Sequence, residues 1–346
     1  MTDAKITSPA KVLIIVSFVA GLVFTGVALV GMLESPPPSG SILSVFAILS
    51  ILVGVTRLWP IVVYLDLESE SLNLDEGLLV MAVLLLPSPY AMATFVVSTA
   101  VVQAIHRRSP RKAMFNWGQV VASAGVGVVV SRFIAGYGPA PGLAAVAAAA
   151  TAAVVFFALN SAWMAAIVSA TGTSWVTALK EGLTVRIWLL SASVATSAML
   201  AMATASHSWA IGFAVVTLLI IRQLIAGHFQ ALHDRFRLLG LFKVALAANQ
   251  SLREDEVLTA LLLSTRTLLR SNAEVTERRP APGELAAEMS INGHPLSLIV
   301  SARARNEPFD AADLELIQAL AAMGPVPSGT PPSTRNSGDS RSACRR

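Results

Sequence analysis

The sequence has little charge and almost no cysteine. Only 13% of its 346 residues are charged, against about 25% in ordinary soluble proteins. The apolar share is 54% and the mean hydropathy is +0.66, so the chain has too little polar surface to enclose its apolar residues in water. This balance excludes an ordinary cytosolic enzyme. The single cysteine, Cys344, excludes a disulfide framework and a cysteine-based zinc or iron–sulfur site.

The few charges are spread unevenly. Residues 1–226 hold 11 Lys and Arg and 8 Asp and Glu, whereas residues 227–346 hold 14 and 13. These are about 8% and about 22% of the positions in the two parts. The sequence therefore predicts a membrane block followed by a soluble block. Because most basic residues of the first block flank apolar runs, membrane topology explains the net charge of +4 better than a nucleic-acid partner does.

Eight apolar runs are predicted to be membrane-spanning helices, which need about 20 residues each. They cover residues 12–33, 41–57, 77–86, 90–105, 113–134, 143–170, 187–205 and 209–224. The third run is short and ends at Pro87-Ser88-Pro89, so we expect it to form a tight helical hairpin with the fourth. Connecting segments that carry Lys or Arg alternate with segments that carry none, Arg132 being the exception. This alternation predicts that both termini face the cytoplasm.

The segment between the second and third runs differs from its neighbours. It begins with apolar Ile61-Val62-Val63 and then alternates polar and apolar residues, which is typical of a short extended segment. It also carries a cluster of acidic residues, namely Asp66, Glu68, Glu70, Asp75 and Glu76. We interpret this cluster as a solvated turn at the membrane surface in preference to a cation site.

The predicted spans contain amide side chains, of which Asn116, Gln119 and Asn160 are candidates for a site. Asn116 and Gln119 are three residues apart on one helical face, and Asn160 lies in another span. Polar groups are costly in lipid and suggest a functional site by default. These amides could line a small-ligand pocket, or they could form hydrogen bonds between helices worth about 0.6–2 kcal/mol each. We favour helix packing over the ligand pocket.

Residues 227–250 are predicted to form a signalling or linker helix that leaves the membrane. Its apolar residues recur at intervals of four and three: Ile225, Phe229, Leu232, Phe236 and Leu239. Such a stripe can pack on the following domain or form the seam of a homodimer. Gly240 indicates a break in the helix after the stripe.

Residues 251–323 are predicted to form a small α+β domain. Apolar residues at helical spacing continue to Arg270, and strand-like runs follow at 273–276, 285–291 and 296–302. A last helix should begin after Asp310 and bury Leu314, Ile317 and Leu320. Residues 324–346 contain 14 Pro, Gly, Ser or Thr among 23 positions, which predicts a disordered tail.

Two stretches carry a resemblance to a known family. Arg107 to Gln119 opens a helix, and with Ala158-Leu159-Asn160 and the acidic extended segment it resembles the membrane-embedded input region of bacterial cyclic di-GMP signalling proteins. Those proteins carry GGDEF, EAL or HD-GYP output domains. In the soluble block, Pro295 to Ala302 followed by Glu307 to Leu314 resembles the end of a shortened GAF domain.

The resemblance implies a polytopic α-helical membrane bundle over residues 1–226, followed by the linker helix, a GAF-like cytoplasmic domain and the tail. In such proteins a catalytic domain normally follows the last helix. Residues 324–346 contain no Gly-Gly-Asp/Glu-Glu-Phe loop, no Glu-Ala-Leu motif and no His-Asp with Gly-Tyr-Pro. We therefore predict no catalytic residue, metal ligand or cofactor site in this chain.

The resulting expectation is a non-catalytic sensor or regulatory protein of bacterial signal transduction, located in the bacterial inner membrane. Its expected partners are membrane lipid, a second copy of the chain and a separate signalling output protein, but not nucleic acid. One alternative is a cyclase or phosphodiesterase truncated before its output domain. Another is a small-solute transporter, which the lack of a clear inverted repeat and the scarcity of intramembrane charges disfavour.

Overall fold

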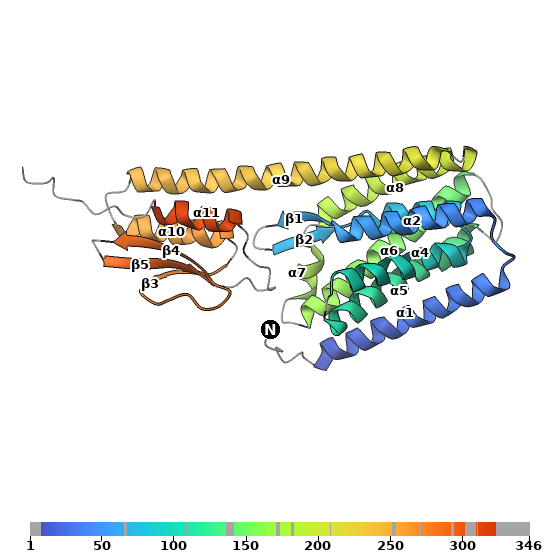
Figure 1. The fold of residues 1–346 in the computed structure, drawn as a ribbon, viewed down its shortest axis with the longest axis horizontal. Coiled ribbons are helices and arrows are strands. Elements are labelled where there is room, and N and C mark those ends of the chain that lie inside the picture. The colour runs from blue at the N-terminus through green and yellow to red at the C-terminus, as the bar shows by residue number, and fades with distance from the viewer. Residues whose placement is uncertain are drawn as a thin grey trace, which may run out of the picture. The chain divides into compact units, whose positions relative to one another are not determined.

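The described part of the chain forms two compact units in the computed structural model (Figure 1). The bundle unit extends to His228, apart from residues 66–69, and the second unit begins at Phe229. The structure describes residues 8–65, 68–107, 109–135, 142–170, 174–180, 183–207, 209–250, 254–269, 271–291, 294–301, 309 and 311–322.

Helices make up most of the bundle unit. They are α1 (Ser8–Glu34), α2 (Gly40–Leu58), α3 (Asp75–Leu85), α4 (Ser88–Ile105), α5 (Pro110–Ala135), α6 (Leu143–Ser169), α7 (Trp175–Lys180), α8 (Leu183–Ser206) and the first half of α9 (Ala210–Gln250). Among the described residues, seven helices are long and apolar enough to cross a membrane: α1, α2, α4, α5, α6, α8 and the Ala210–Leu232 part of α9. The chain is therefore a multi-pass membrane protein by length and composition.

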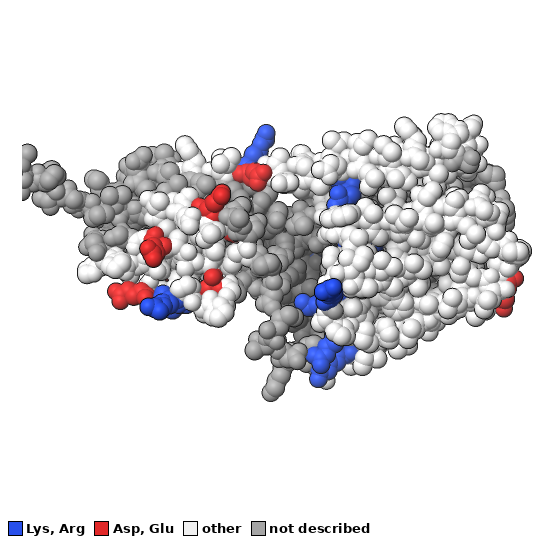
Figure 2. Space-filling view, viewed as in Figure 1, with Lys and Arg blue, Asp and Glu red and all other residues white. Residues whose placement is uncertain are grey.

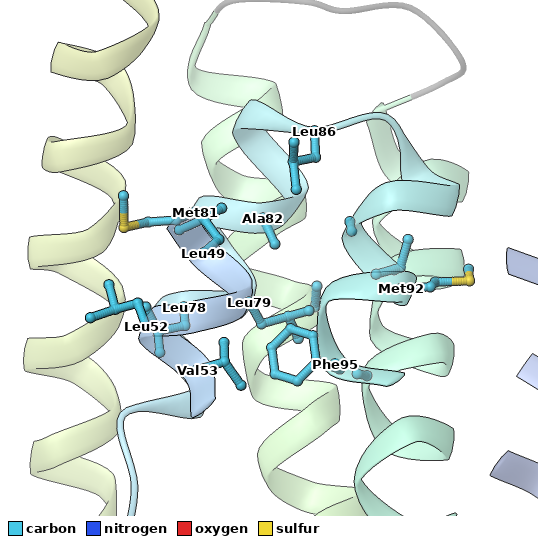
Figure 3. Packing of buried hydrophobic residues seen from close by; sticks show 14 of the residues in the cluster. Leu49, Leu52, Val53, Leu78, Leu79, Met81, Ala82, Leu86, Met92 and Phe95 are labelled. Carbon is cyan, nitrogen blue, oxygen red and sulfur yellow. The ribbon is translucent and has the colours of Figure 1, made fainter. Parts of the chain in front are cut away.

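The expectation of eight spanning helices was wrong, because the third apolar run is only a half-helix. Helix α3 has 11 residues, or about 16 Å of helix, whereas the hydrocarbon core of a bilayer is about 30 Å thick. Extended backbone at Leu86 ends α3, and Pro87 then precedes α4. The predicted hairpin of α3 and α4 is present: Figure 3 shows α3 ending at Leu86 beside the start of α4.

The segment between α2 and α3 is extended, as its alternating pattern predicted. It contains strands β1 (Ile61–Leu65) and β2 (Glu68–Leu72), which pair in a two-stranded sheet. Ile61, at the start of β1, is buried.

The half-helix α3 occupies the centre of the bundle core. Leu78, Leu79 and Met81 are almost completely buried, and they pack with residues of α2, α4, α5, α6 and α8. Figure 3 shows the side chains of α3 between those of α2 and Phe95 of α4.

Small residues allow close approach of the spanning helices. A methyl group added at Gly118 of α5 would lie 2.7 Å from the backbone nitrogen of Phe18 in α1. One added at Gly21 of α1 would lie 2.8 Å from the Cα of Gly118. Since the two glycines face each other, α1 and α5 cross at backbone contact distance, as small residues permit in membrane helices.

The second unit holds the last part of α9 and a small α+β fold. Its other elements are α10 (Glu254–Leu269), β3 (Ala273–Thr276), β4 (Leu285–Ile291), β5 (His294–Val300) and α11 (Ala311–Ala322). The antiparallel sheet has the order β3-β5-β4, with both Ala273 and Leu285 opposite Val300. Alternate residues of β4 and β5 share one buried cluster with α10 and α11, so the helices cover one sheet face.

Three strands of this domain lie close to the predicted positions, and Pro295 fits their pairing. It lies opposite Ser290 of β4, whereas β3 pairs only with residues 297–300 of β5. A residue without a backbone N–H is tolerated there because no strand flanks β5 on the other side at that position.

Two predictions about the soluble helices were wrong. Leu314 is 40% exposed, whereas Asp313, Ile317 and Leu320 are completely buried. Positions 313, 317 and 320 share one face of a helix at 3.6 residues per turn, which leaves Leu314 about 100° away from it. Helix α9 also continues unbroken through Gly240 to Gln250. Helix α11 begins at Ala311, directly after the predicted cap Asp310. Asp310 itself and the tail lie outside the described residues.

Candidate functional site

Helix α3 begins beside the last turn of α2 and against α8. A methyl group added at Gly77 would lie 2.5 Å from Ser197 Oγ and 2.9 Å from the carbonyl oxygen of Ser193. Ser193 lies ten residues after the start of α8 at Leu183, which corresponds to about 15 Å along that helix. The first turn of α3 is therefore level with the middle of α8.

An ion pair is buried at this point. Arg57, in the last turn of α2, donates from its Nη2 to Asp75 Oδ2 at 2.5 Å. Only 9% of the arginine side chain and 5% of the aspartate side chain are exposed. Asp75 is the first residue of α3, where the helix dipole favours a negative charge. The pair thus ties the end of one spanning helix to the start of the half-helix.

Several polar atoms of α3, of the residues just before it and of the neighbouring α8 are buried without a hydrogen-bond partner. They include Asp75 Oδ1, Asn73 Oδ1, Ser193 Oγ and Ser197 Oγ. The residues Ser193 and Ser197 are more than nine-tenths buried, and both hydroxyls face the backbone of Gly77. Buried oxygen atoms normally have partners, and an orphan acceptor costs about 1–3 kcal/mol. The two serine hydroxyls lie against Gly77, which is about 200° around α3 from Asp75. We call Arg57, Asn73, Asp75, Glu76, Ser193 and Ser197 the α3 polar site.

The charges of this site do not balance. Glu76 follows Asp75 directly, and the charges that act on it are those of Asp75 and Arg57. Glu76 is partly exposed, whereas Asp75 is buried and paired with Arg57. Charged groups within a membrane bundle are rare and usually mark a site of function.

The end of α2 also contacts α9. Arg222 of α9 donates from its Nη2 to the carbonyl oxygen of Trp59, two residues after Arg57. The segment Arg57–Trp59 therefore contacts both the start of α3 and the helix that leads out of the bundle.

Basic residues gather at one end of the bundle. They lie at the ends of successive elements and include Lys11 of α1, Arg57 of α2, Arg111 and Lys112 of α5, Lys180 of α7 and Arg186 of α8. Figure 2 shows Lys and Arg at one end of an otherwise largely uncharged surface. We call this end the basic end.

Protein-family models, curated proteins and solved structures were compared with this chain, and none matches it. The interpretation of the site therefore depends on its own geometry. Within the described part of the chain, no group of three or more His, Cys, Asp or Glu residues could hold a metal ion.

The three amides predicted from the sequence lie on two packed helices, α5 and α6. Gln119 is buried, and its Nε2 lies 3.6 Å from the sulfur of Met164 in α6. Met164 is one helical turn beyond Asn160, while Asn116 is about one turn before Gln119. Both asparagines are half-buried. Gln119 Oε1 is buried and without a hydrogen-bond partner. This arrangement tests neither the ligand pocket nor helix packing by hydrogen bonds, and both stay predictions.

The acidic cluster was misinterpreted in one important respect. Asp75 is not in a solvated turn but is among the most buried charged residues described. The overlooked signal was the short apolar run that follows it. An acidic pair, ten apolar residues and then Pro87 indicate a half-helix, and short or proline-interrupted segments in membrane proteins often mark binding sites. Ser193 and Ser197 gave no signal, because serines are common in spanning helices.

The stripe predicted for the linker helix lies on one face of α9. Ile225, Phe229 and Leu232 are half-buried, and Leu239 is 56% exposed. The side chain of Phe236 lies outside the described residues.

Proposed function

We propose that the chain is a non-catalytic membrane sensor or regulator in which the α3 polar site receives the signal and α9 transmits it. The observation that carries this proposal is the double role of the segment Arg57–Trp59. Its arginine pairs with Asp75, and its last carbonyl accepts a hydrogen bond from Arg222 of α9. A change at the α3 polar site that displaces Arg57 therefore acts two residues away from a contact with α9.

Helix α9 is suited to carry such a displacement. It has 41 residues, begins within the bundle and ends within the second unit without an interruption. Small shifts and rotations of continuous helices are an established means of switching. The resemblance to input regions of cyclic di-GMP signalling proteins supports the same role. We place the basic end on the cytoplasmic side of a bacterial inner membrane by the distribution of Lys and Arg, with both termini on that side.

The output of the proposed sensor is a contact between proteins. We propose that the α9 stripe forms a homodimer seam, because Leu239 exposes apolar surface on the face that also carries Leu232. A single amphipathic face of this kind is typical of helices that pair. The GAF-like second unit then presents the signal to a separate output protein.

Cysteine cross-linking tests the homodimer seam in a Cys344→Ser background. Leu232→Cys and Leu239→Cys should cross-link two copies in membranes. Leu238→Cys is the matched control: its parent side chain is 65% exposed, but it lies about 100° around the helix from Leu239. We expect at least several-fold less dimer from position 238. Equal yields of cross-linked dimer at the three positions, or no cross-linked dimer at all, would contradict the proposed seam.

The transmission step has its own test in the same assay. Arg222→Gln should change the ratio of cross-linking at positions 239 and 238, because it removes the charged contact between α9 and Trp59. Arg132→Gln is the control, since Arg132 is also a bundle arginine and donates to Ser88 Oγ far from this contact. The purified chain should turn over neither GTP nor cyclic di-GMP. An unchanged ratio in Arg222→Gln, or measurable turnover, would contradict the proposal.

The α3 polar site also favours a second candidate function, a small-solute transporter. Half-helices whose ends lie inside a bundle commonly form transporter binding sites, and the buried Arg57–Asp75 pair supplies an intramembrane charge. Uptake of solute by proteoliposomes that contain the protein, lost in Asp75→Asn, would favour this function over the sensor.

A further inference from the structure

We propose that the starts of α1 and α5, at the basic end, form a binding site for one anionic phospholipid. In this site Lys11 and Arg111 contact the phosphate group, and an acyl chain lies along Ile15 and Trp117. The inference goes beyond the proposed sensor and does not depend on it. It depends on the register of the two helices, on the contacts of Trp117 and on the charge and exposure of the surrounding side chains.

Helices α1 and α5 run in parallel and in register. Gly118 of α5 packs against the backbone of Ser17 in α1, and Gly125 packs against Phe24. The two contacts are seven residues apart on each helix, which is about two turns. The starts of the two helices therefore lie side by side.

Two cations lie at this common start. Lys11 precedes Ser17 by six residues and Arg111 precedes Gly118 by seven, so each lies about 10 Å before the contact between the helices. Both side chains are exposed. The first turns of α1 and α5 contain no acidic residue, and Lys11 forms no ion pair with any other described residue. An anion from outside the chain is therefore complementary to this surface.

Trp117 separates α1 from α4 near the basic end. Its ring centroid is 5.6 Å from that of Phe18 in α1, and its Nε1 donates to the carbonyl oxygen of Val96 in α4 at 3.3 Å. Towards the opposite end the same two helices meet directly, because a methyl group added at Gly31 would lie 2.7 Å from the ring of Pro89. An indole thus lies between α1 and α4 at one end, whereas the helices are in contact at the other.

Apolar surface is exposed beside this indole. Ile15 lies almost one turn nearer the basic end than Phe18 and is 58% exposed. Ala100, one turn nearer that end than the carbonyl that accepts from Trp117, is also exposed, and Trp117 itself is half-buried. Lys11 lies within about 20° of Phe18 around α1. A cation at the end of an exposed apolar strip matches a phospholipid, whose phosphate adjoins its acyl chains, better than it matches a free anion.

Native mass spectrometry of the purified full-length protein tests the site. The protein is released from detergent micelles that contain equal amounts of phosphatidylglycerol and phosphatidylcholine with identical acyl chains. We expect one phosphatidylglycerol to bind in preference to phosphatidylcholine by at least about fivefold, because it alone carries a net negative charge. Glycerophosphoglycerol has the same phosphate group without acyl chains and should not compete at equal concentration.

Two variants and a matched control locate the lipid. Lys11→Gln and Arg111→Gln should each weaken the binding of phosphatidylglycerol by about fivefold, the contribution of one basic residue close to an anionic lipid. Lys11→Arg keeps the charge and should retain the binding. Lys112→Gln is the control, because Lys112 is exposed at the same end but lies about 140° around α5 from Trp117. It should bind the lipid like the natural protein. Since all three substituted side chains are exposed, the variants should fold, which thermal unfolding checks.

Equal binding of the two lipids would overturn the proposal. Equal losses in Lys11→Gln and Lys112→Gln would also overturn it, because the lipid would then respond to the total charge of the basic end and not to a site. Competition by glycerophosphoglycerol would identify a free anion as the ligand in place of a lipid. None of these outcomes bears on the sensor, which the Arg222→Gln cross-linking ratio tests separately.

Discussion

Two arginine–carboxylate pairs in this chain have almost the same geometry in opposite surroundings. Arg57 meets Asp75 at 2.5 Å within the bundle unit, and Arg278 meets Glu284 at 2.6 Å in the second unit. The side chain of Arg57 is 9% exposed, whereas that of Arg278 is 40% exposed. Distance alone therefore does not indicate what a pair contributes. The surroundings decide how much each charge depends on its partner.

The physical reason is solvation. Water screens the exposed pair and replaces either partner when the pair opens. In the bundle no such replacement exists, so Asp75 without Arg57 would be a buried charge without compensation. The buried pair therefore adds little net stability, but the fold around α3 requires both of its partners. The exposed pair orders the segment between β3 and β4.

Removal of each arginine gives the largest predicted difference. Arg57→Gln should destabilise the bundle by about 3–5 kcal/mol, the cost of leaving a buried charge unpaired. Arg278→Gln, the same change at the surface, should have little effect. Chemical unfolding of both variants in the same detergent measures the difference. The double variant Arg57→Gln with Asp75→Asn should recover part of the loss, because neither charge remains.

Similar losses for Arg57→Gln and Arg278→Gln would show that water reaches the bundle pair. In that case the α3 polar site would not be a desolvated site.

The next largest effect comes from helix packing in the bundle. Gly118→Ala should lower stability by about 1–3 kcal/mol, the usual cost of an overpacked core, because the new methyl group would contact the backbone of α1 at Phe18. Gly26→Ala, on the facing helix α1, meets nothing within 4 Å and should be neutral or slightly stabilising, since alanine favours helices over glycine. Thermal unfolding in detergent compares the two.

A Gly118→Ala variant as stable as Gly26→Ala would mean that α1 moves away from α5 without cost. The close crossing of the two helices would then contribute nothing to the bundle.

Much of the secondary structure could be predicted from local sequence patterns. The long apolar runs and the alternation of β3, β4 and β5 depend on neighbours within a few residues, and the structure confirms them. The ten apolar residues 77–86 are too few to span a bilayer and so indicate a half-helix. The neighbours of α3 could not be predicted in this way, because they depend on packing between elements.

The candidate site was less accessible from sequence than the fold. Amides such as Asn116 and Asn160 can be recognised within a single apolar run. The ion pair between Arg57 and Asp75 cannot, because it joins residues 18 positions apart. The hydroxyls of Ser193 and Ser197 belong to the α3 polar site only because Gly77 packs against them. Such combinations come from packing between elements, which a pattern along one element does not contain.

The smallest predicted effect belongs to the surface pair under acid. Arg278 and the backbone N–H of Ala281 donate to the carboxylate of Glu284 and lower its pKa from 4.5 to about 2. A lowered pKa means that the folded state gains stability from this group above about pH 4.5 and loses it as the pH falls towards 2. NMR titration of the Glu284 carboxyl in the full chain should show this low midpoint. Arg278→Gln should return the pKa of Glu284 towards 4.5. Glu288 of β4, ten residues after Arg278, serves as the control carboxyl in the same spectra. A midpoint near 4.5 in the natural protein would mean that solvent screens the surface pair completely, which would widen the contrast with Arg57 and Asp75.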